Sequence, residues 1–496
     1  MGDILRPDLC VIGAGSGGLS VAAIAASFGV SVVLVEKGEM GGDCLNVGCV
    51  PSKALIAAAE RAQAMREGAV FGLGAARPKA DFSILREHVR GVIDAIAPND
   101  SVARYTAMGV RVVQAPARFI DRLTVVAGDA TIQARRFVIA TGSRPATPDI
   151  PGLSDVAYLT NESIFDLGEQ PERLVVIGGG PIGLEIAQAY RRLGCKVIVL
   201  EAHRILPRED RELAQEIERQ LLADGVELRQ GVGIVKVAQE KAGEKQARVI
   251  LTLQRDGQGD GQSDGQGEGG VGETVDGSHL LVATGRTPTI ADLGLDLAGV
   301  KTNPSGIVVD RGLRTSNRRI YAIGDCASGG TQGYRFTHAA NHHAGLVVRS
   351  ALFRLPVKLD NSVIPRVTYT DPELAVVGLS EEEARSRYKQ IRVLRWPVAE
   401  NDRAQAERRV AGHIKAIVAK NGLILGCAIA APGAGELISL WTLAISKGMK
   451  AQDLAGIVIP YPTFSEISKR AAVEHLRPAA RSAFVRRILS FLRRLG

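Results

Sequence analysis

An apolar run of 27 residues, from Leu9 to Val35, contains no charged side chain, but its pattern is not that of a membrane span. Five glycines interrupt the run, and the spacing of its apolar positions changes from that of a strand to that of a helix and back. We expect a buried strand over residues 9–12, a tight turn over 13–18, a helix of small residues over 19–28 and a second strand over 31–35. The run therefore predicts a complete βαβ unit and neither a transmembrane helix nor a signal peptide.

The same pattern recurs later in the chain. A strand predicted at residues 174–177 leads into a glycine-rich turn at 178–183, a helix, and a second strand at 196–200. Two apolar stretches, 137–142 and 280–285, both end in Thr-Gly, and we expect each to close a nucleotide-binding domain. A further buried strand is expected at 320–323 and leads to Gly324-Asp325. The carboxylate of Asp325 could accept a hydrogen bond from a polyol hydroxyl. The chain is thus expected to hold two dinucleotide-binding domains.

Both turns follow the spacing G-x-G-x-x-G, which has a physical reason. The first glycine permits a sharp bend, the second lets backbone N–H groups approach a pyrophosphate, and the third lets the helix pack closely on the strand. Glu36 and Glu201 each follow the last glycine of their turn by 18 residues, where a carboxylate can accept hydrogen bonds from ribose hydroxyls. Glu201 would repel a 2′-phosphate and so favours NADH, although His203 and Arg204 could approach a phosphate and favour NADPH.

The composition and the charge distribution narrow the class of protein. A chain of 496 residues is long enough for several domains, and six cysteines are too few for an extracellular disulfide framework. The net charge of +8 is concentrated near the C-terminus, because residues 469–496 hold eight Lys and Arg side chains against one Glu. The preceding 468 residues carry a net charge of only +1, so we expect no nucleic-acid partner.

One pair of cysteines stands out by its position. Cys44 and Cys49 lie in the segment 42–53, where Pro51 is a natural first residue of the Ala-rich helix that follows. The helix N-terminus and Lys53 would lower the pKa of the Cys49 thiol. Cys44 is expected on a flexible segment flanked by glycines, near enough to form a reducible disulfide with Cys49. Zinc is the alternative, but no second cysteine pair accompanies this one, so no metal site is expected. The remaining cysteines, at positions 10, 195, 326 and 427, are interpreted as buried small residues.

In these motifs the chain resembles the pyridine nucleotide-disulfide oxidoreductases, the flavoenzyme family that includes dihydrolipoamide dehydrogenase, glutathione reductase and mercuric reductase. The resemblance rests on Gly13/Gly15/Gly18 with Glu36, on Cys44-Leu-Asn-Val-Gly-Cys49-Val-Pro-Ser-Lys53, on Gly178/Gly180/Gly183 with Glu201, and on Gly324-Asp325. It implies an α/β fold, with two Rossmann-like dinucleotide-binding domains plus a C-terminal α+β dimerisation domain. FAD, NADH or NADPH, and a homodimer are implied as well. The implied bounds are 1–148 and 285–355 for the FAD-binding domain, 149–284 for the NAD(P)H-binding domain, 356–478 for the dimerisation domain and 479–496 for a basic amphipathic tail.

The resemblance also implies roles for the site residues. Cys49 would be the thiolate that touches the flavin, Cys44 the thiol that exchanges with the acceptor, and Lys53 the partner of Glu185 beside the reactive nitrogen of the flavin. Two electrons would pass between NAD(P)H, FAD, the Cys44–Cys49 disulfide and a small-molecule acceptor. The expected catalytic residues are Cys44, Cys49, Lys53, Glu185, Tyr461 and Glu466. The expected cofactor-binding residues are Gly13, Gly15, Gly18, Glu36, Lys53, Thr141, Gly142, Gly178, Gly180, Gly183, Glu201, Gly285, Arg286, Gly324 and Asp325.

The sequence departs from the family pattern at the histidine that transfers protons. Members that exchange with a dithiol carry His-Pro-Thr-x-x-Glu, whereas this chain has Tyr461-Pro-Thr-Phe-Ser-Glu466. We expect a flavin-dependent disulfide oxidoreductase of the dihydrolipoamide dehydrogenase type. The alternative, which the tyrosine favours, is a mercuric reductase-like reductase of a metal ion or a quinone, although no C-terminal cysteine pair follows Cys427. A more remote alternative is a non-catalytic, redox-responsive flavoprotein.

Two segments lie outside the family pattern. Residues 256–277 are rich in Gly, Gln, Asp and Glu, and we expect them to form a solvated loop without chemistry. Beyond residue 481, apolar residues recur at helical spacing among arginines, so the tail predicts a basic amphipathic helix. Such a helix fits either docking on its own dimer or the surface of an anionic bilayer. The expected location is the cytoplasm, with peripheral contact to the inner membrane surface as the further option.

Overall fold

The computed structural model describes residues 4–74, 76–240, 248–255, 272–330, 334–480 and 482–495. The chain forms two compact units. The first unit comprises Met1–Arg204 and Gly225–Leu359, and the second comprises Ile205–Asp224 and Asp360–Gly496. Each unit has its own sheets, and each is described by itself.

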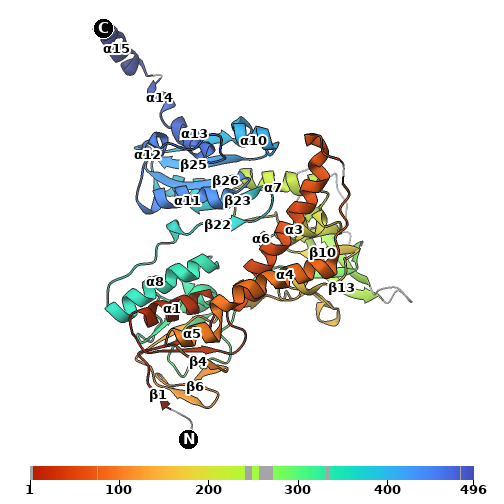
Figure 1. Ribbon diagram of the computed structural model, residues 1–496, viewed down its shortest axis with the longest axis vertical. Helices are drawn as coiled ribbons and strands as arrows, with labels where there is room; N and C mark the ends of the chain where they lie inside the picture. Colours follow the sequence, from red (N-terminus) through yellow and green to blue (C-terminus); the bar gives the residue numbers. More distant parts are fainter. Residues whose placement is uncertain are drawn as a thin grey trace, which may run out of the picture. The chain divides into compact units, whose positions relative to one another are not determined.

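A parallel five-stranded sheet lies at the centre of the first half of the first unit, in the order β20-β8-β2-β3-β4. Every residue of β2 is buried, as is usual for a parallel strand that is covered on both faces. α1 (Ser16–Ser27) follows β2 and lies beside α8 (Thr337–Phe353), where Ser20 Oγ donates to Asn341 Oδ1 at 3.0 Å (Figure 1). The strands are β2 (Leu9–Ile12), β3 (Val32–Glu36), β4 (Arg111–Gln114), β8 (Arg136–Ile139) and β20 (Ile320–Ala322).

A second parallel sheet has the order β12-β11-β10-β16 and repeats the same βαβ arrangement. α6 (Pro181–Arg192) follows β10 and begins with a proline, which fits the first helical turn because the N–H groups there have no partner within the helix. The strands are β10 (Arg173–Ile177), β11 (Lys196–Glu201), β12 (Glu227–Gln230) and β16 (His279–Val282). The two βαβ units expected from the hydrophobic pattern are therefore confirmed, and so is the α/β fold class.

Three local expectations need correction. α1 begins at Ser16, within the expected turn, because Gly15 already serves as its N-terminal cap. The helix that carries Cys49 begins at that cysteine rather than at Pro51, because a proline is tolerated anywhere in the first helical turn. The expected loop 256–277 ends in a strand, β15 (Glu273–Gly277), whose backbone pairs with β14 and whose Val275 is buried opposite Leu251. Residues 256–271 of that loop lie outside the described residues.

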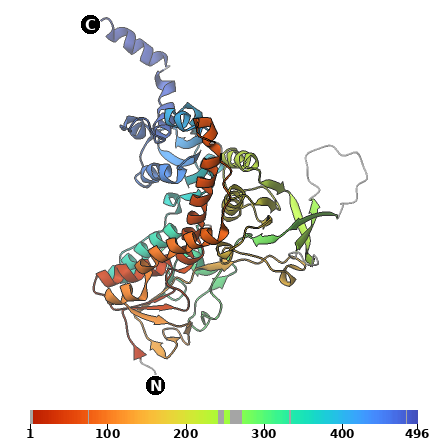
Figure 2. The ribbon, with the colours of Figure 1, turned by 45° about the vertical axis from the view of Figure 1, so that its right-hand side comes forward.

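The cysteine segment is held between helices of the first unit. Cys44 lies in the short helix α2 (Gly42–Asn46), where a flexible segment was expected, and Cys49 opens α3 (Cys49–Glu67). α3 packs against α4 (Phe82–Ile96) and α6 (Figure 2). A turn of 3₁₀ helix, Ala97–Asp100, continues α4, and α5 (Val102–Ala107) follows it.

Smaller sheets complete the first unit. They have the orders β1-β7-β6-β5, β13-β14-β15, β17-β9 and β18-β19-β21. Their bounds are β1 (Ile4–Leu5), β5 (Ala117–Phe119), β6 (Val125–Ala127), β7 (Ala130–Ile132), β9 (Ser143–Pro145), β13 (Val232–Glu240), β14 (Arg248–Arg255), β17 (Arg286–Pro288), β18 (Thr302–Asn303), β19 (Gly306–Val309) and β21 (Ala327–Gly329). The pairing of β17 with β9 is the one that bears on the site, because it brings Arg286 beside Ser143.

The second unit is an antiparallel sheet of order β22-β23-β26-β25-β24 with helices packed on it. Its core centres on Trp441, which is fully buried and whose indole N–H donates to Ser468 Oγ at 3.1 Å. The strands are β22 (Arg366–Thr368), β23 (Glu373–Gly378), β24 (Ile391–Pro397), β25 (His413–Ala419) and β26 (Ile424–Ala431). The helices are α7 (Arg211–Ala223), α9 (Glu381–Arg387), α10 (Asp402–Glu407), α11 (Ala434–Ser446), α12 (Ala451–Gly456), α13 (Glu466–Glu474), α14 (Arg477–Ala480) and α15 (Ala483–Leu492).

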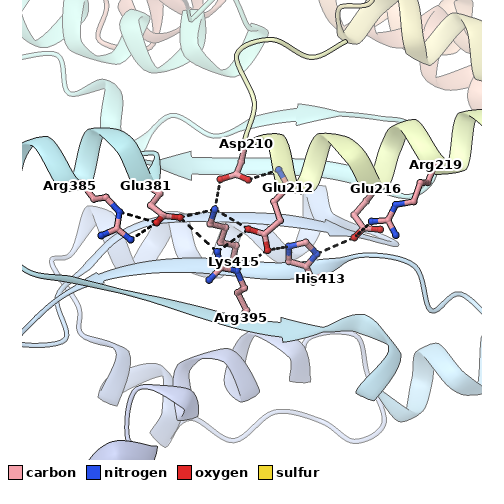
Figure 3. A network of polar contacts seen from close by, with 9 residues as sticks. All are labelled: Asp210, Glu212, Glu216, Arg219, Glu381, Arg385, Arg395, His413 and Lys415. Atoms are coloured by element: carbon pink, nitrogen blue, oxygen red, sulfur yellow. Dashed lines mark hydrogen bonds and ion pairs between the residues drawn. The ribbon is translucent and has the colours of Figure 1, made fainter. Parts of the chain in front are cut away.

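A buried lysine fastens α7 to this sheet. Lys415 projects from β25 with only 6% of its side chain exposed, and its Nζ lies 2.7 Å from Asp210, 3.2 Å from Glu212 and 2.9 Å from Glu381 (Figure 3). Asp210 also caps the N-terminus of α7 by accepting from the backbone N–H of Glu212. Three carboxylates thus surround one desolvated ammonium group, which is the arrangement that a buried cation requires.

The C-terminal tail forms the amphipathic helix that its spacing predicts. No residue of α15 is buried, and its apolar side chains remain exposed, with 71% of Phe484 and 61% of Phe491 accessible to solvent. Ser482 caps the helix by accepting from the backbone N–H of Val485. No helix among the described residues is long and apolar enough to cross a membrane.

Candidate functional site

The two glycine-rich turns have the same geometry in the first unit. Gly13 and Gly178, the first glycines, have φ values of +103° and +114°, which only glycine adopts without strain. A Cβ on Gly18 or Gly183, the third glycines, would collide with the carbonyl oxygen of the first glycine of the same turn.

The middle glycines are different, since a Cβ on Gly15 or Gly180 would meet no atom within 4 Å. The first and third glycines are therefore required by packing, whereas the middle ones face open space. Open space above a helix N-terminus, bordered by backbone N–H groups, is what a pyrophosphate needs. The geometry of both turns fits a bound dinucleotide.

Glu36 and Glu201 end the second strand of the first and the second βαβ unit, and their hydrogen bonds are equivalent. Glu36 Oε2 accepts from the backbone N–H of Ala14, and its Oε1 accepts from Gly38 at 2.8 Å. Glu201 Oε2 accepts from the backbone N–H of Gly179 at 2.7 Å, and its Oε1 accepts from His203 at 3.0 Å. Each carboxylate is thus fixed at the edge of its glycine-rich turn, where a ribose would lie next to a pyrophosphate.

Further polar groups fit the expected FAD. The hydroxyl of Thr141 is buried and, among the described residues, has no hydrogen-bond partner, so it offers an unused polar contact. Asp325 Oδ2 accepts from Ser143 Oγ at 2.6 Å, and Arg286 Nε donates to the same hydroxyl at 2.6 Å. Gly142, Gly285 and Gly324 all have positive φ values. These residues lie in, or within a few residues of, β8, β9, β17 and β20, so the site gathers the ends of four strands.

The two cysteines are hydrogen-bonded free thiols with opposite pKa shifts. The hydrogen bond from Cys44 and the nearby Thr337 and Lys53 lower the pKa of Cys49 to about 6. The same hydrogen bond, burial and the negative charge of Asp100 raise the pKa of Cys44. At neutral pH the pair therefore carries one thiolate, on Cys49, and one thiol, on Cys44.

Lys53 and Glu185 form an ion pair beside Cys49. Lys53 Nζ lies 2.8 Å from Glu185 Oε2, and the carboxylate side chain is only 8% exposed. Lys53 lies one turn beyond Cys49 on α3, and Glu185 lies in α6 two residues after Gly183. The positive charge lowers and the negative charge raises the pKa of Cys49, so the pair adjusts the thiolate without adding net charge.

Tyr461 and Glu466 lie in the second unit. Tyr461 is 69% exposed and donates its hydroxyl to Asp402 Oδ2 at 2.8 Å, while Glu466 opens α13. The hydrogen bond to Asp402 raises the pKa of Tyr461 above its usual value. Asp402, and not Glu466, accepts the hydrogen bond of the Tyr461 hydroxyl.

The sequence reasoning missed several residues of the site. Thr337, whose hydroxyl lies 3.6 Å from Cys49 Sγ, is the first residue of α8. Asp43, next to Cys44, forms an ion pair with Arg286. Of these two residues, only Thr337 could have been recognised, by its position at the start of a helix, because the contact of Asp43 with Arg286 joins distant segments.

Comparisons with known proteins agree with this geometry. Residues 7–344 match the pyridine nucleotide-disulphide oxidoreductase family, and residues 364–472 match its dimerisation domain, which supports a homodimer. A mercuric reductase of Streptomyces lividans is 37% identical over 476 residues, covering 94% of this chain and 95% of that protein. A dihydrolipoyl dehydrogenase of Geobacillus stearothermophilus is 35% identical over 476 residues, covering 94% and 96% of the two chains.

A solved structure is similar over nearly the whole chain. The Cu(II) complex of the HOCl-induced flavoprotein disulfide reductase RclA from Escherichia coli has a TM-score of 0.79 and 26% sequence identity, and the match covers 93% of this chain and 98% of that one. The glycine-rich turns, the Cys44 and Cys49 thiols and these matches all indicate the same family. The chain belongs to the pyridine nucleotide-disulphide oxidoreductase family, as a flavin-dependent disulfide oxidoreductase.

Proposed function

We propose that the chain is an NAD(P)H-dependent flavoenzyme that reduces a thiophilic acceptor at Cys44, rather than a dihydrolipoamide dehydrogenase. The observation that carries this proposal is the hydrogen bond from Tyr461 to Asp402. A phenol with a raised pKa remains protonated at neutral pH, and this one already donates its proton to a carboxylate. It is therefore a poor base for an incoming dithiol, whose oxidation requires proton removal.

Reduction of an acceptor by NAD(P)H uses the Cys44 thiol and the Cys49 thiolate in the state that the structure favours. Bound FAD would supply the chemistry that passes two electrons from NAD(P)H to the Cys44–Cys49 disulfide. With those two electrons and one proton the S–S bond breaks, and Cys49 becomes a thiolate while Cys44 becomes a thiol. Lys53 and Thr337 stabilise the negative charge on Cys49. Two helix N-termini and a lysine thus favour the product of reduction.

Exchange at Cys44 then returns the pair to its oxidised form. After losing its proton, Cys44 attacks one sulfur of a disulfide acceptor, which breaks the acceptor's S–S bond and releases a first thiol. Cys49 then attacks the sulfur of Cys44 in the mixed disulfide, which forms the Cys44–Cys49 bond again and releases the second thiol. The overall change is NAD(P)H plus H⁺ plus disulfide to NAD(P)⁺ plus two thiols. A metal acceptor would take the same two electrons, either one mercuric ion reduced to the metal or two cupric ions reduced to cuprous ions.

The other site assignments belong to the same proposal. Glu36 and the first glycine-rich turn, with Thr141, Gly142, Gly285, Arg286, Gly324 and Asp325, would hold FAD. Glu201 and the second turn would hold the nicotinamide cofactor, with NADH favoured. The domain bounds stay as expected from the resemblance, at residues 1–148 and 285–355, 149–284, and 356–478, and the cytoplasm stays the proposed location.

The acceptor is tested by a panel assayed with NADH and with NADPH on the purified holoenzyme. The panel holds mercuric ion, cupric ion, a quinone, glutathione disulfide and lipoamide; cupric ion is included because RclA, a structural relative, is known as a Cu(II) complex. We expect turnover with a metal ion or a small disulfide, and slow oxidation of dihydrolipoamide. Rapid dihydrolipoamide oxidation would favour the second candidate, a dihydrolipoyl dehydrogenase, as in the Geobacillus relative. No turnover with any acceptor, artificial dyes included, would point to a non-catalytic flavoprotein.

The C-terminal helix α15 suggests where in the cell the protein works. α15 exposes Phe484, Ile488 and Phe491 on a helix that also carries arginines, and this pattern is complementary to an anionic bilayer. Each basic residue near such a surface contributes roughly 1 kcal/mol, which salt screens. Peripheral binding to the inner membrane surface is the arrangement that we propose for this helix.

Vesicle co-sedimentation tests the tail. The full chain should bind anionic vesicles at low salt and leave them at high salt, whereas a chain ending at Pro478 should not bind. A Phe484→Ser/Phe491→Ser variant keeps the charge and should also lose binding, because the apolar side chains no longer insert. Equal binding by the full and shortened chains would contradict the proposal, and loss of the dimer on shortening would show that the helix docks on its own protein.

A further inference from the structure

A carboxylate that the family motifs do not include lies beside the exchange thiol. Asp100 ends the 3₁₀ turn that continues α4, and its position is fixed by Ser101, which donates to Pro98 O at 2.9 Å and caps α5. A Cβ on Gly41, the residue that precedes α2, would lie 3.1 Å from Asp100 Oδ2. The carboxylate therefore rests against the start of the helix that carries Cys44.

The other charges near the two thiols are neutralised in pairs. Asp43 pairs with Arg286, and Glu185 pairs with Lys53. Among the described residues, by contrast, no hydrogen bond or ion pair engages the carboxylate of Asp100. The two sulfurs therefore have different surroundings. Cys49 has an ion pair beside it, whereas the carboxylate near Cys44 has no ion-pair partner among the described residues and only feels the charge of Arg104.

We propose that Asp100 is a specificity residue that selects acceptors by charge, admitting cationic and neutral acceptors to Cys44 and disfavouring anionic ones. The inference rests on the proposed function, in which Cys44 is the thiol that meets the acceptor. It places metal cations and uncharged or cationic disulfides among the substrates, and it places glutathione disulfide, which carries a net negative charge, among the poor ones.

The size of the effect follows from Coulomb's law at a partly solvated surface. Asp100 is partly buried, and its pKa is raised by that burial, with Arg104 acting in the opposite direction. A charge on the acceptor several ångströms away would change the rate of its encounter with Cys44 by roughly two- to fivefold per unit charge at low ionic strength. Salt should reduce this discrimination, because part of the path between the charges runs through solvent.

The first test compares three model disulfides of similar size with the NADH-reduced holoenzyme. Cystamine carries two positive charges, bis(2-hydroxyethyl) disulfide none, and 3,3′-dithiodipropionate two negative charges. Because the two compounds differ by four unit charges, we expect Asp100→Asn to lower the kcat/KM ratio of cystamine to dithiodipropionate by roughly 16-fold or more, and Asp100→Glu to retain it. Asp94→Asn, which removes an exposed carboxylate from the same helix, is the matched control and should leave the ratio unchanged.

The second test does not depend on turnover. The two-electron-reduced holoenzyme is alkylated with iodoacetamide, which is neutral, or iodoacetate, which is anionic, and modification of Cys44 is followed by peptide mass. Asp100→Asn should raise the iodoacetate-to-iodoacetamide rate ratio at Cys44 several-fold, and high salt should do the same to the unmodified protein.

The outcomes separate the two proposals. If no disulfide and no metal ion is reduced, the proposed function fails, while the alkylation ratio still decides the role of Asp100. The kcat/KM ratio of cystamine to dithiodipropionate and the iodoacetate-to-iodoacetamide rate ratio decide the role of Asp100. If both ratios are the same in the unmodified protein, in Asp100→Asn and at high salt, that role is refuted and the proposed function stands. Should Asp100→Asn fail to fold, the salt dependence of the unmodified protein and the Asp100→Glu variant supply the same decision.

Discussion

The hydroxyl group of Thr337 lies 3.6 Å from Sγ of Cys49, although the two residues are 288 positions apart in the chain. Thr337 is the first residue of α8 and Cys49 is the first residue of α3, so the N-terminal turns of two helices come together at one sulfur. The positive ends of both helix dipoles and a hydroxyl donor then act on the same atom. The hydrogen bond from Cys44 is the largest influence that lowers the pKa of Cys49, and Thr337 and Lys53 add to it.

The first prediction separates the two cysteines by spectroscopy. In this family the thiolate that touches the flavin gives a long-wavelength charge-transfer absorbance after two-electron reduction. The band should persist in Cys44→Ser, because Cys49 keeps its charge, and should vanish in Cys49→Ser. Loss of the band in both variants, or in neither, would overturn the assignment of the thiolate to Cys49.

The second prediction concerns Thr337. Replacing it with valine removes a hydrogen bond to the charged sulfur, which contributes roughly 1.5–3 kcal/mol in typical cases and less at the length seen here. The pKa of Cys49, about 6 in the natural protein, should therefore rise by about one unit. Titration of the charge-transfer band measures it. Thr337→Ser keeps the hydroxyl and should leave the midpoint in place, and an equal shift in both variants would show that packing, not the hydrogen bond, is responsible.

The third prediction concerns Tyr461. Tyr461→His provides an imidazole whose pKa lies near neutrality, and Asp402 is placed to accept a hydrogen bond from it. Dihydrolipoamide oxidation, which should be slow in the natural protein, is expected to rise at least tenfold, since a positioned general base contributes roughly 10²–10⁴-fold. Tyr461→Phe serves as the control and should leave dihydrolipoamide oxidation slow. Rapid oxidation by the unmodified protein would contradict the argument.

The fourth prediction concerns the nicotinamide cofactor. Glu201 is fixed by Gly179 and His203 at the edge of the second glycine-rich turn, where it would repel a 2′-phosphate. We expect kcat/KM to be about tenfold or more higher for NADH than for NADPH, and this preference to shrink in Glu201→Gln, which keeps one acceptor oxygen and removes the charge. A higher kcat/KM for NADPH in the unmodified protein would show that His203 and Arg204 dominate the site.

The fifth prediction concerns stability and pH. Lys415→Met leaves Asp210, Glu212 and Glu381 without their shared cation and should lower the free energy of unfolding by about 3 kcal/mol. Arg385→Met removes an exposed partner of Glu381 and is the control, with an expected loss below about 1 kcal/mol. Similar losses in both variants would contradict the special role of the buried lysine.

The same cluster predicts the direction of the pH dependence. Arg395 and Lys415 lower the pKa of Glu212 to about 2, and Lys415 and Arg385 lower the pKa of Glu381. Carboxylates with lowered pKa values stabilise the fold above their unfolded pKa, near 4.3, and this contribution is lost as the pH falls toward the folded value. Unfolding free energies measured between about pH 5 and pH 2 should therefore fall less steeply for Lys415→Met than for the natural chain.

The sequence predicts the parts of this protein that depend on neighbouring residues. Both βαβ units, the small-residue helices and the position of Cys49 at a helix N-terminus follow from local hydrophobic spacing and from glycine and proline chemistry, so they could be read without a structure. Tyr461 was recognised as a departure, but its partner Asp402 was not, because that contact joins two segments that no local pattern relates.

The same limit applies to the charges around the thiols. Asp100 lies 56 residues beyond Cys44, in a turn whose only local signal is a helix end. Its closeness to α2 depends on how α4 packs against α3, which depends in turn on side-chain volumes along both helices. The start of β15 was misjudged for a related reason, since the polar residues of that edge strand carry no hydrophobic alternation that differs from a loop.

The position of α7 has a consequence for synthesis of the chain. α7 follows β11 in the sequence but packs on β23 and β26, with Leu213, Ile217 and Leu221 fully buried. Because β26 ends at Ala431, about 200 residues are translated after α7 before its packing surface is complete. At roughly 5–20 residues per second the ribosome takes about 10–40 s to do so. During that interval the apolar face of α7 has not yet met its packing surface on the nascent chain.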